Sequence, residues 1–204
     1  MPKTSSRTYK GSQNETYKNI LDAATRLFAE HGYDRVGMRD VCDLVGVSLP
    51  SVYHYFKDKQ NLYRAVELAN FGRVEARLIK AMNKAGSPIL RLKAFMTELY
   101  NLLNSDASFR NLAIRNMLDP DVSHHKFLVS HTLQELFDRL VTLLREYRKD
   151  VDAEVLAYAM ISGIFGFVVL SPSKPHIQGY PKARSKAKER DSYIEHLLQS
   201  VNAF

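Results

Sequence analysis

The stretch from Gly46 to Phe56 reads G-V-S-L-P-S-V-Y-H-Y-F, and it decides how the residues around it fold. Gly46 is suited to end one short helix, and Ser48 can cap the next by accepting a hydrogen bond from a free backbone N–H. Pro50 then falls in the first turn, where its missing N–H does no damage. Two helices joined by a tight turn containing glycine form a helix-turn-helix motif, whose second helix enters the DNA major groove. The stretch therefore predicts DNA binding.

Composition is consistent with a nucleic-acid partner. The chain has 204 residues, of which 45% are hydrophobic, so it can bury a sizeable core and is not a disordered protein. A net charge of +7 and a pI near 9.4 suit a polyanionic partner. The single cysteine, Cys42, excludes an internal disulfide framework and indicates a reducing compartment. We expect Cys42 to be a small buried hydrophobic residue.

Two features of the sequence favour a cytoplasmic protein that does not enter the membrane. The N-terminal M-P-K-T-S-S-R-T-Y-K has no apolar core and does not resemble a signal peptide. The most hydrophobic run, Val155 to Leu170, is uncharged but shorter than the roughly 20 residues needed to span a bilayer.

The first part of the chain reads as a polar arm followed by four helices, because every convincing segment has helical rather than alternating period. The expected elements are a flexible basic arm over 1–13 (Lys3, Arg7, Lys10), a helix from a capping box at Ser12–Glu15 to about His31, a short helix from Met38 to Leu44 that buries Val41 and Leu44, a recognition helix over Leu49 to Tyr55, and a helix capped by Asp58 that reaches about Ala85.

The remainder of the chain also has only helical signals. The expected elements are a helix after Gly86-Ser87-Pro88 with Leu92, Phe95, Met96, Leu99 and Leu103 buried, a short helix ending before Asp119-Pro120, a long helix over 123–149, an apolar helix over 152–170, a loop over 171–188, and a last amphipathic helix. The prediction is an all-α protein of about nine helices. A helix-turn-helix DNA-binding domain over 14–65 precedes a larger helical domain over 66–204.

The segments I-L-D-A-A-T-R-L-F-A-E-H-G-Y, M-R-D-V-C-D-L-V-G-V-S and S-V-Y-H-Y-F-K-D-K-Q-N-L lie between Asn19 and Val66. In order, spacing and helix logic they resemble the TetR family of transcriptional regulators, the tetracycline-repressor-like proteins. The resemblance implies a ligand-responsive repressor that binds a palindromic operator as a homodimer, with no cofactor. The chain departs from the common pattern at Val36, Gly37, Cys42 and Pro50. These changes affect which DNA sequence is read.

The resemblance also assigns contacts to DNA. It places Tyr53 and His54 at the phosphate backbone and makes Lys59 a phosphate clamp at a helix N-terminus. The alternative is that these three are ordinary surface residues. Candidates for groove contact are Ser48, Leu49, Pro50 and Ser51. Arg39 can bind a base or a phosphate, or it can pair with Asp43 four residues later on the same helix.

Small side chains on one face of the apolar helix allow another helix to approach closely. With the last helix they predict a four-helix dimer interface, two helices from each subunit; the alternative is a helix buried within its own subunit. The predicted interface residues are Ala159, Ser162, Gly163, Gly166, Ile194, Leu197, Leu198 and Val201.

The middle helices carry side chains that could line a pocket for an apolar or amphipathic small molecule. These are Met96, Tyr100, Phe109, Met117, Phe137 and Phe165, each of which can equally be plain core. Arg115 is either a partner for an acidic ligand or a surface residue. His124, His125 and His131 do not predict a metal site, because adjacent histidines on a helix face different sides and no patterned carboxylates complete a ligand set.

Two other functional classes can be compared with a DNA-binding regulator. An enzyme is not predicted, because the chain has no nucleophile elbow, phosphate loop, metal-ligand spacing or glycine-rich cofactor turn. A helical ligand-binding or interaction module with a vestigial DNA-binding domain is the alternative. Tyr53, His54 and Lys59 argue against it.

Overall fold

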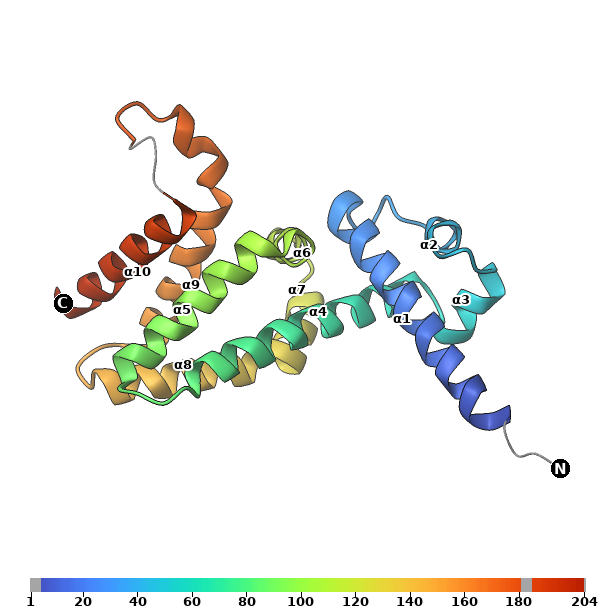
Figure 1. Ribbon diagram of the computed structural model, residues 1–204, viewed down its shortest axis with the longest axis horizontal. Coiled ribbons are helices and arrows are strands. Elements are labelled where there is room, and N and C mark those ends of the chain that lie inside the picture. Colours follow the sequence, from blue (N-terminus) through green and yellow to red (C-terminus); the bar gives the residue numbers. More distant parts are fainter. Residues whose placement is uncertain (1–4, 181–184, 204) are drawn as a thin grey trace. The chain divides into compact units, whose positions relative to one another are not determined.

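The computed structural model describes the backbone of residues 5–180 and 185–203, and the side chains of residues 14–180 and 185–200. These residues are helical or irregular and form no strand, which confirms the predicted all-α class (Figure 1). The elements are α1 (Ser5–His31), α2 (Met38–Val45), α3 (Leu49–Tyr55), α4 (Lys59–Met82), α5 (Pro88–Ser105), α6 (Ala107–Met117), α7 (Val122–Leu128), the π-helix η1 (Val129–Leu133), α8 (Gln134–Tyr147), α9 (Ala153–Val169), the 3₁₀-helix η2 (Ser171–His176) and α10 (Lys186–Ala203).

Some element boundaries differ from the prediction. Helix α1 begins at Ser5, inside the expected flexible arm, so the Ser12–Glu15 capping box lies within a helix. No proline interrupts residues 5–13, and their backbone hydrogen bonds can therefore continue into α1. Lys3 and the side chains of Arg7 and Lys10 lie outside the described residues. The expected long helix over 123–149 is interrupted by the π-helix η1, and part of the expected loop over 171–188 is the 3₁₀-helix η2.

The first of two compact units comprises the described chain as far as Phe71, together with Ala107–His125. Within it α1 packs against both α2 and α6. Its core includes Phe28, Val41 and Val52 from the N-terminal helices and Leu112 from α6. A segment far along the chain therefore completes the core beneath the helix-turn-helix. The sequence-based domain boundary at 65 and 66 stays a prediction.

Leu44, which was predicted to be buried, is 53% exposed. Helix α2 turns the arc through Val41, Cys42 and Val45 toward the core, and Leu44 lies outside that arc. Cys42 is buried as expected, and burial raises the pKa of its thiol.

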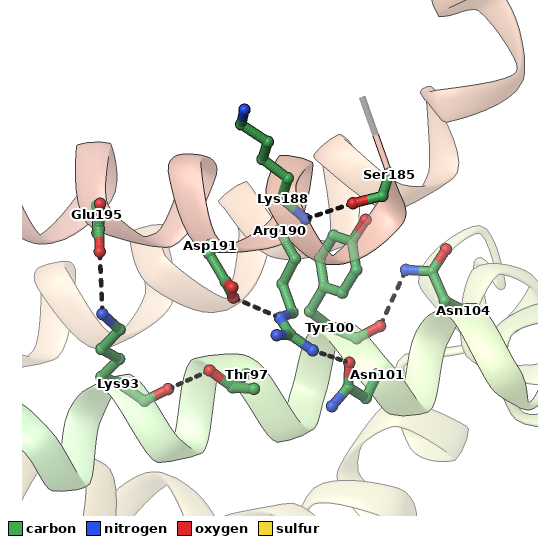
Figure 2. A network of polar contacts seen from close by, with 10 residues as sticks. All are labelled: Lys93, Thr97, Tyr100, Asn101, Asn104, Ser185, Lys188, Arg190, Asp191 and Glu195. Carbon is green, nitrogen blue, oxygen red and sulfur yellow. Dashed lines mark hydrogen bonds and ion pairs between the residues drawn. The ribbon is translucent and has the colours of Figure 1, made fainter. Parts of the chain in front are cut away.

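The second unit, Gly72–Asp106 with the described residues from Lys126 onward, is built around α5. Helix α5 packs against α8, α9 and α10, and its predicted core face from Leu92 to Leu103 is buried. Polar contacts also join α10 to α5 (Figure 2). Lys93 Nζ lies 3.1 Å from Glu195 Oε1, and Arg190 donates from Nη1 to Asn101 Oδ1 at 3.1 Å.

Candidate nucleic-acid interface

The turn between α2 and α3 has the geometry that its glycine predicts. Gly46 ends α2 with φ of 76°, in the left-handed region that favours glycine. The backbone N–H groups of Gly46 and Val47 both donate to the carbonyl of Cys42, at 2.8 and 3.1 Å. These bonds satisfy one of the free carbonyls in the last turn of α2 and help to set the direction in which α3 leaves the turn.

Helix α3 begins as predicted, but its cap differs in detail. Ser48 occupies the N-cap position and Pro50 falls in the first turn. The Ser48 side chain makes no cap hydrogen bond; its hydroxyl oxygen lies 2.8 Å from that of Ser51. The Ser48 carbonyl instead accepts from the N–H groups of Ser51 and Val52, at 3.0 and 3.3 Å. The predicted side-chain cap is wrong because the two hydroxyls pair with each other.

The inner face of α3 fixes the orientation of its outer face. Val52 is fully buried, and the ring of Phe56 stacks on that of Tyr17 with 5.2 Å between centroids. Tyr55 is half-buried against the same core and Phe56 is buried, so both are core residues as expected. With this side anchored, the opposite side of α3 faces solvent.

The predicted DNA contacts can all be reached from solvent. Ser48, Pro50, Tyr53 and His54 are exposed, and Leu49 and Ser51 are half-buried. Arg39 is exposed on α2, and within the described part of the chain it forms no salt bridge with Asp43. The surface thus offers hydroxyls, aromatic rings and one guanidinium. The individual contacts stay predictions.

Lys59 lies at the N-terminus of α4, where Asp58 Oδ1 accepts from the N–H of Asn61 at 2.7 Å. That hydrogen bond lowers the pKa of Asp58. Lys59 Nζ lies 4.3 Å from the centroid of the Tyr33 ring and donates to the Asp34 carbonyl at 3.4 Å. An ammonium has three donors, so this placement leaves others free for a phosphate.

Arg115 ties α6 to the end of α1. Its Nη2 donates to the Glu30 carbonyl at 2.8 Å and its Nε to the Ala29 carbonyl at 3.4 Å. A positive group at a helix C-terminus is favourable because the free carbonyls there carry partial negative charge. Arg115 therefore links α6 to α1 within the folded first unit, a contact the sequence did not indicate.

A buried polar cluster lies within the same unit and was missed by sequence reasoning. Glu67 on α4 is 0% exposed, and its Oε1 lies 3.0 Å from His124 Nε2. His124 Nε2 also lies 2.7 Å from Asn116 Oδ1. The pKa of Glu67 is raised to about 7 by burial, which outweighs the lowering by Asn116 and Tyr63. A signal existed in the sequence, since Glu67 falls on the apolar face of α4 beside Val66.

The six predicted pocket residues are divided between the two units. Met96, Tyr100 and Phe165 are buried in the second unit, where Phe137 is half-buried. Phe109 is buried in the first unit against Phe71, and Met117 is 57% exposed. An open, largely polar groove of about 540 Å³ lies in the second unit; it contains none of the six and is lined by Met82, Asn83, Arg91, Ser130, Gln134, Glu135, Asp138, Arg139, Thr142, Leu143 and Glu146. The ligand pocket stays a prediction.

The predicted dimer residues on α9 and α10 differ in exposure. Ala159 and Ser162 are exposed, and Gly163, Gly166 and Leu197 are half-buried. Ile194 and Leu198 are already buried within the chain and have little surface left to offer a partner. The side chain of Val201 lies outside the described residues. Val155 and Tyr158 extend the exposed face of α9, with Tyr158 71% exposed. The interface itself stays a prediction.

None of the described helices is long and apolar enough to cross a membrane. Each of the three histidines His124, His125 and His131 has a partner within the protein. His124 contacts Glu67 and Asn116, while His125 and His131 contact the carbonyls of Asp119 and Phe127.

Helix α3 is short, is anchored on its inner side and has its outer side in solvent, and Lys59 begins the helix that follows. This arrangement is that of a helix-turn-helix DNA-binding protein. Residues 20–66 match the model of the bacterial regulatory proteins of the tetR family. The chain is 30% identical over 158 residues to the transcriptional repressor AcnR of Corynebacterium diphtheriae. The match covers 74% of this chain and 78% of AcnR. The chain belongs to the tetR family and is a DNA-binding transcriptional regulator.

Solved structures share the same fold. FadR of Bacillus subtilis in complex with stearoyl-CoA superposes with a TM-score of 0.73 at 17% identity, covering 89% of this chain and 97% of that one. AibR in complex with isovaleryl coenzyme A and operator DNA gives a TM-score of 0.70 at 16% identity, covering 91% and 97%. At these identities the likeness establishes the fold alone.

Proposed function

We propose that this regulator is a homodimeric repressor that binds a palindromic operator and is controlled by an amphipathic small molecule. The observation that carries the proposal is the outward face of α3, which leaves Tyr53 and His54 free while Val52 is fully buried. Paired recognition helices read two half-sites about one DNA turn apart, which requires a dimer. Such a protein acts on DNA in the cytoplasm and catalyses no reaction.

The ligand class is proposed from chemistry and from the fold neighbours. The second unit has a large apolar core around α5, and ligand pockets are lined mostly by apolar side chains. Acyl-CoA thioesters join an apolar acyl chain to a polar nucleotide, and two neighbours of the same fold were solved with such ligands. They are therefore the first compounds to test. A coupling of about 1–3 kcal/mol between ligand and DNA would change operator affinity roughly 5- to 150-fold.

The test begins with retention of fragmented bacterial DNA on the purified protein at near-physiological salt, followed by sequencing. We expect an enriched palindrome, whose complex then dissociates when a series of acyl-CoA thioesters is titrated in. Retention that is independent of sequence and sensitive to salt would favour the alternative, a ligand-binding module with a vestigial DNA-binding domain. Sequence-specific retention that no thioester alters would overturn the ligand class alone.

Lys59→Ala tests the phosphate clamp on the selected operator. We expect weaker binding to every sequence, and a slope of log affinity against log salt that is shallower by about 1 per half-site. The matched control is Lys80→Ala, an exposed lysine on the same helix α4 but in the second unit. Equal salt slopes for both variants would remove Lys59 from the contacts.

A further inference from the structure

The buried Glu67 lies at one end of a continuous set of side-chain contacts within the first unit. Next to its carboxylate is His124, and the His124 ring stacks on that of Tyr63 with 5.8 Å between centroids and 28° between planes. Tyr63 meets the ring of Tyr33 edge-on at 5.0 Å. The other end is Lys59, whose Nζ lies 4.3 Å from the Tyr33 ring centroid.

Each contact in this set constrains the next. His124 Nε2 lies 3.0 Å from Glu67 Oε1 and 2.7 Å from Asn116 Oδ1, and these two contacts restrain the His124 imidazole. Tyr63 is buried between that imidazole and Phe28, whose ring it meets at 5.0 Å, so it has little freedom to turn. Tyr33 is a partly exposed ring that rests on Phe28 and Tyr63. An aromatic face in a fixed position attracts a cation above it.

The cluster is costly for the fold. In the described structure both carboxylate oxygens of Glu67 and the amide nitrogen of Asn116 are buried without a well-formed hydrogen bond. A buried charge that is only partly compensated destabilises a protein, and an apolar pair of similar shape would stabilise this core better. The cluster lies in the same unit as the predicted DNA-binding surface, so a role beyond packing is considered for it.

We infer that His124, held by Glu67, positions Lys59 for phosphate through the rings of Tyr63 and Tyr33. The inference rests on the proposed function and deepens it, because it names side chains that position one contact of the same DNA surface. All of these side chains lie within the first unit. Loss of the His124 ring would leave Tyr63, Tyr33 and therefore Lys59 less firmly placed.

The decisive experiment uses the free full-length protein, so its outcome does not depend on DNA binding. Protons held over an aromatic face are shifted upfield in NMR spectra, and the Lys59 side chain should show such a shift. Tyr33→Leu should abolish it and Tyr33→Phe should retain it. His124→Gln keeps an amide donor for Glu67 but removes the ring, and we expect it to reduce the Lys59 shift as well. An unchanged Lys59 shift in folded His124→Gln protein would overturn the inference.

Operator affinity then measures the consequence for function. His124→Gln and Tyr33→Leu should each weaken binding by about two- to fivefold, the worth of an exposed cation–π contact. Neither should weaken it further in a Lys59→Ala background, because the lysine they position is gone. Equal losses in both backgrounds would show a general structural effect and contradict the inference. The matched control is His131→Gln, at a histidine whose Nδ1 lies 2.7 Å from the Phe127 carbonyl oxygen and outside this set of contacts.

The two readouts separate the possible failures. If no DNA sequence is selected, the proposed function falls, while the Lys59 shift still decides whether the rings position this lysine. If the wild type binds an operator and the Lys59 shift is insensitive to His124, the proposed function stands and the positioning role of His124 does not.

Discussion

Glu67 in the first unit is an ionisable residue in a fully buried position. Its side chain lies where helix period calls for an apolar residue, yet it is a carboxyl group with a raised pKa. A buried polar group that is only partly paired reduces the stability of the folded protein. We therefore expect the stability of this protein to vary with pH through Glu67.

Glu67→Gln should change that pH dependence in a defined direction. The folded-state pKa of about 7 is above the unfolded value of about 4.5, so the folded wild type holds the extra proton between these pH values. The contribution of Glu67 to wild-type stability should thus be fully present below about pH 4.5 and be lost as the pH rises through 7, so the wild type should lose on the order of 3 kcal/mol relative to the variant by pH 8. The groups that influence the carboxyl are His124, Asn116, Tyr63, Asp119 and Arg64.

Chemical denaturation of both proteins at several pH values measures the difference. Glu30→Gln, at an exposed glutamate of α1, should follow the wild-type profile and serves as the control. Parallel profiles for wild type and Glu67→Gln would mean that the Glu67 carboxyl keeps an ordinary pKa in the folded protein.

Replacement of glycine by alanine should have opposite effects on stability at Gly46 and at Gly72. Gly46 has a left-handed backbone with open space around a Cβ, so Gly46→Ala should destabilise by about 1 kcal/mol through backbone strain alone. Gly72 lies inside α4 with open space around a Cβ, and Gly72→Ala should stabilise by roughly 0.5–1 kcal/mol. Thermal unfolding of the pair distinguishes them, and the same sign for both would refute the assigned role of Gly46.

At the scale of elements, the contact between α6 and α1 makes the helix-turn-helix part of a larger unit. Leu112 enters the core from α6, and Arg115 binds the carbonyls at the end of α1. Glycine is favoured at position 32 because its φ of 83° is left-handed, and a Cβ there would also lie 2.7 Å from Arg115 Nη1 and displace the end of that side chain. The order of α6 and the position of α1 should therefore be coupled.

Arg115→Ala should lower the free energy of unfolding by about 1 kcal/mol, the value of a cation that satisfies helix C-terminal carbonyls. It should also increase hydrogen exchange of the amides near Gly32 and in α6. Arg26→Ala, at an exposed arginine of α1, is the control and should stay within about 0.5 kcal/mol of wild type. Equal unfolding energies for the two variants would assign Arg115 to the solvated surface.

At the scale of the whole molecule, the regulator that we propose consists of two copies of the chain. The exposed face of α9 combines large apolar side chains with small ones and has no charge along Val155, Tyr158, Ala159 and Ser162. Helix α10 is committed to its own subunit through Ile194 and the polar contacts with α5 (Figure 2). The dimer contact that we propose should therefore rest more on α9 than the sequence suggested.

Tyr158→Arg should place a charge in the middle of this contact and convert the dimer to a monomer that binds the operator at least tenfold more weakly. Sedimentation velocity measures the assembly, and operator titration measures its consequence. Leu90→Arg, at a comparably exposed apolar position on α5, is the control. A Tyr158→Arg protein that remains dimeric would exclude the α9 face as the interface.

The sequence by itself determined the all-α class, the turn between α2 and α3, and the position of the recognition helix α3. Those features depend on near neighbours: a left-handed glycine at Gly46, a proline in a first helical turn, and apolar residues at helical spacing around Val52. It did not determine the exposure of Leu44 or the hydroxyl pairing of Ser48, because each depends on small differences in angle and hydrogen-bond choice. Only the tertiary structure brought Leu112 and Arg115 to α1 and His124 to Glu67. Such contacts join segments far apart in the chain, and their energy comes from packing that no local pattern encodes.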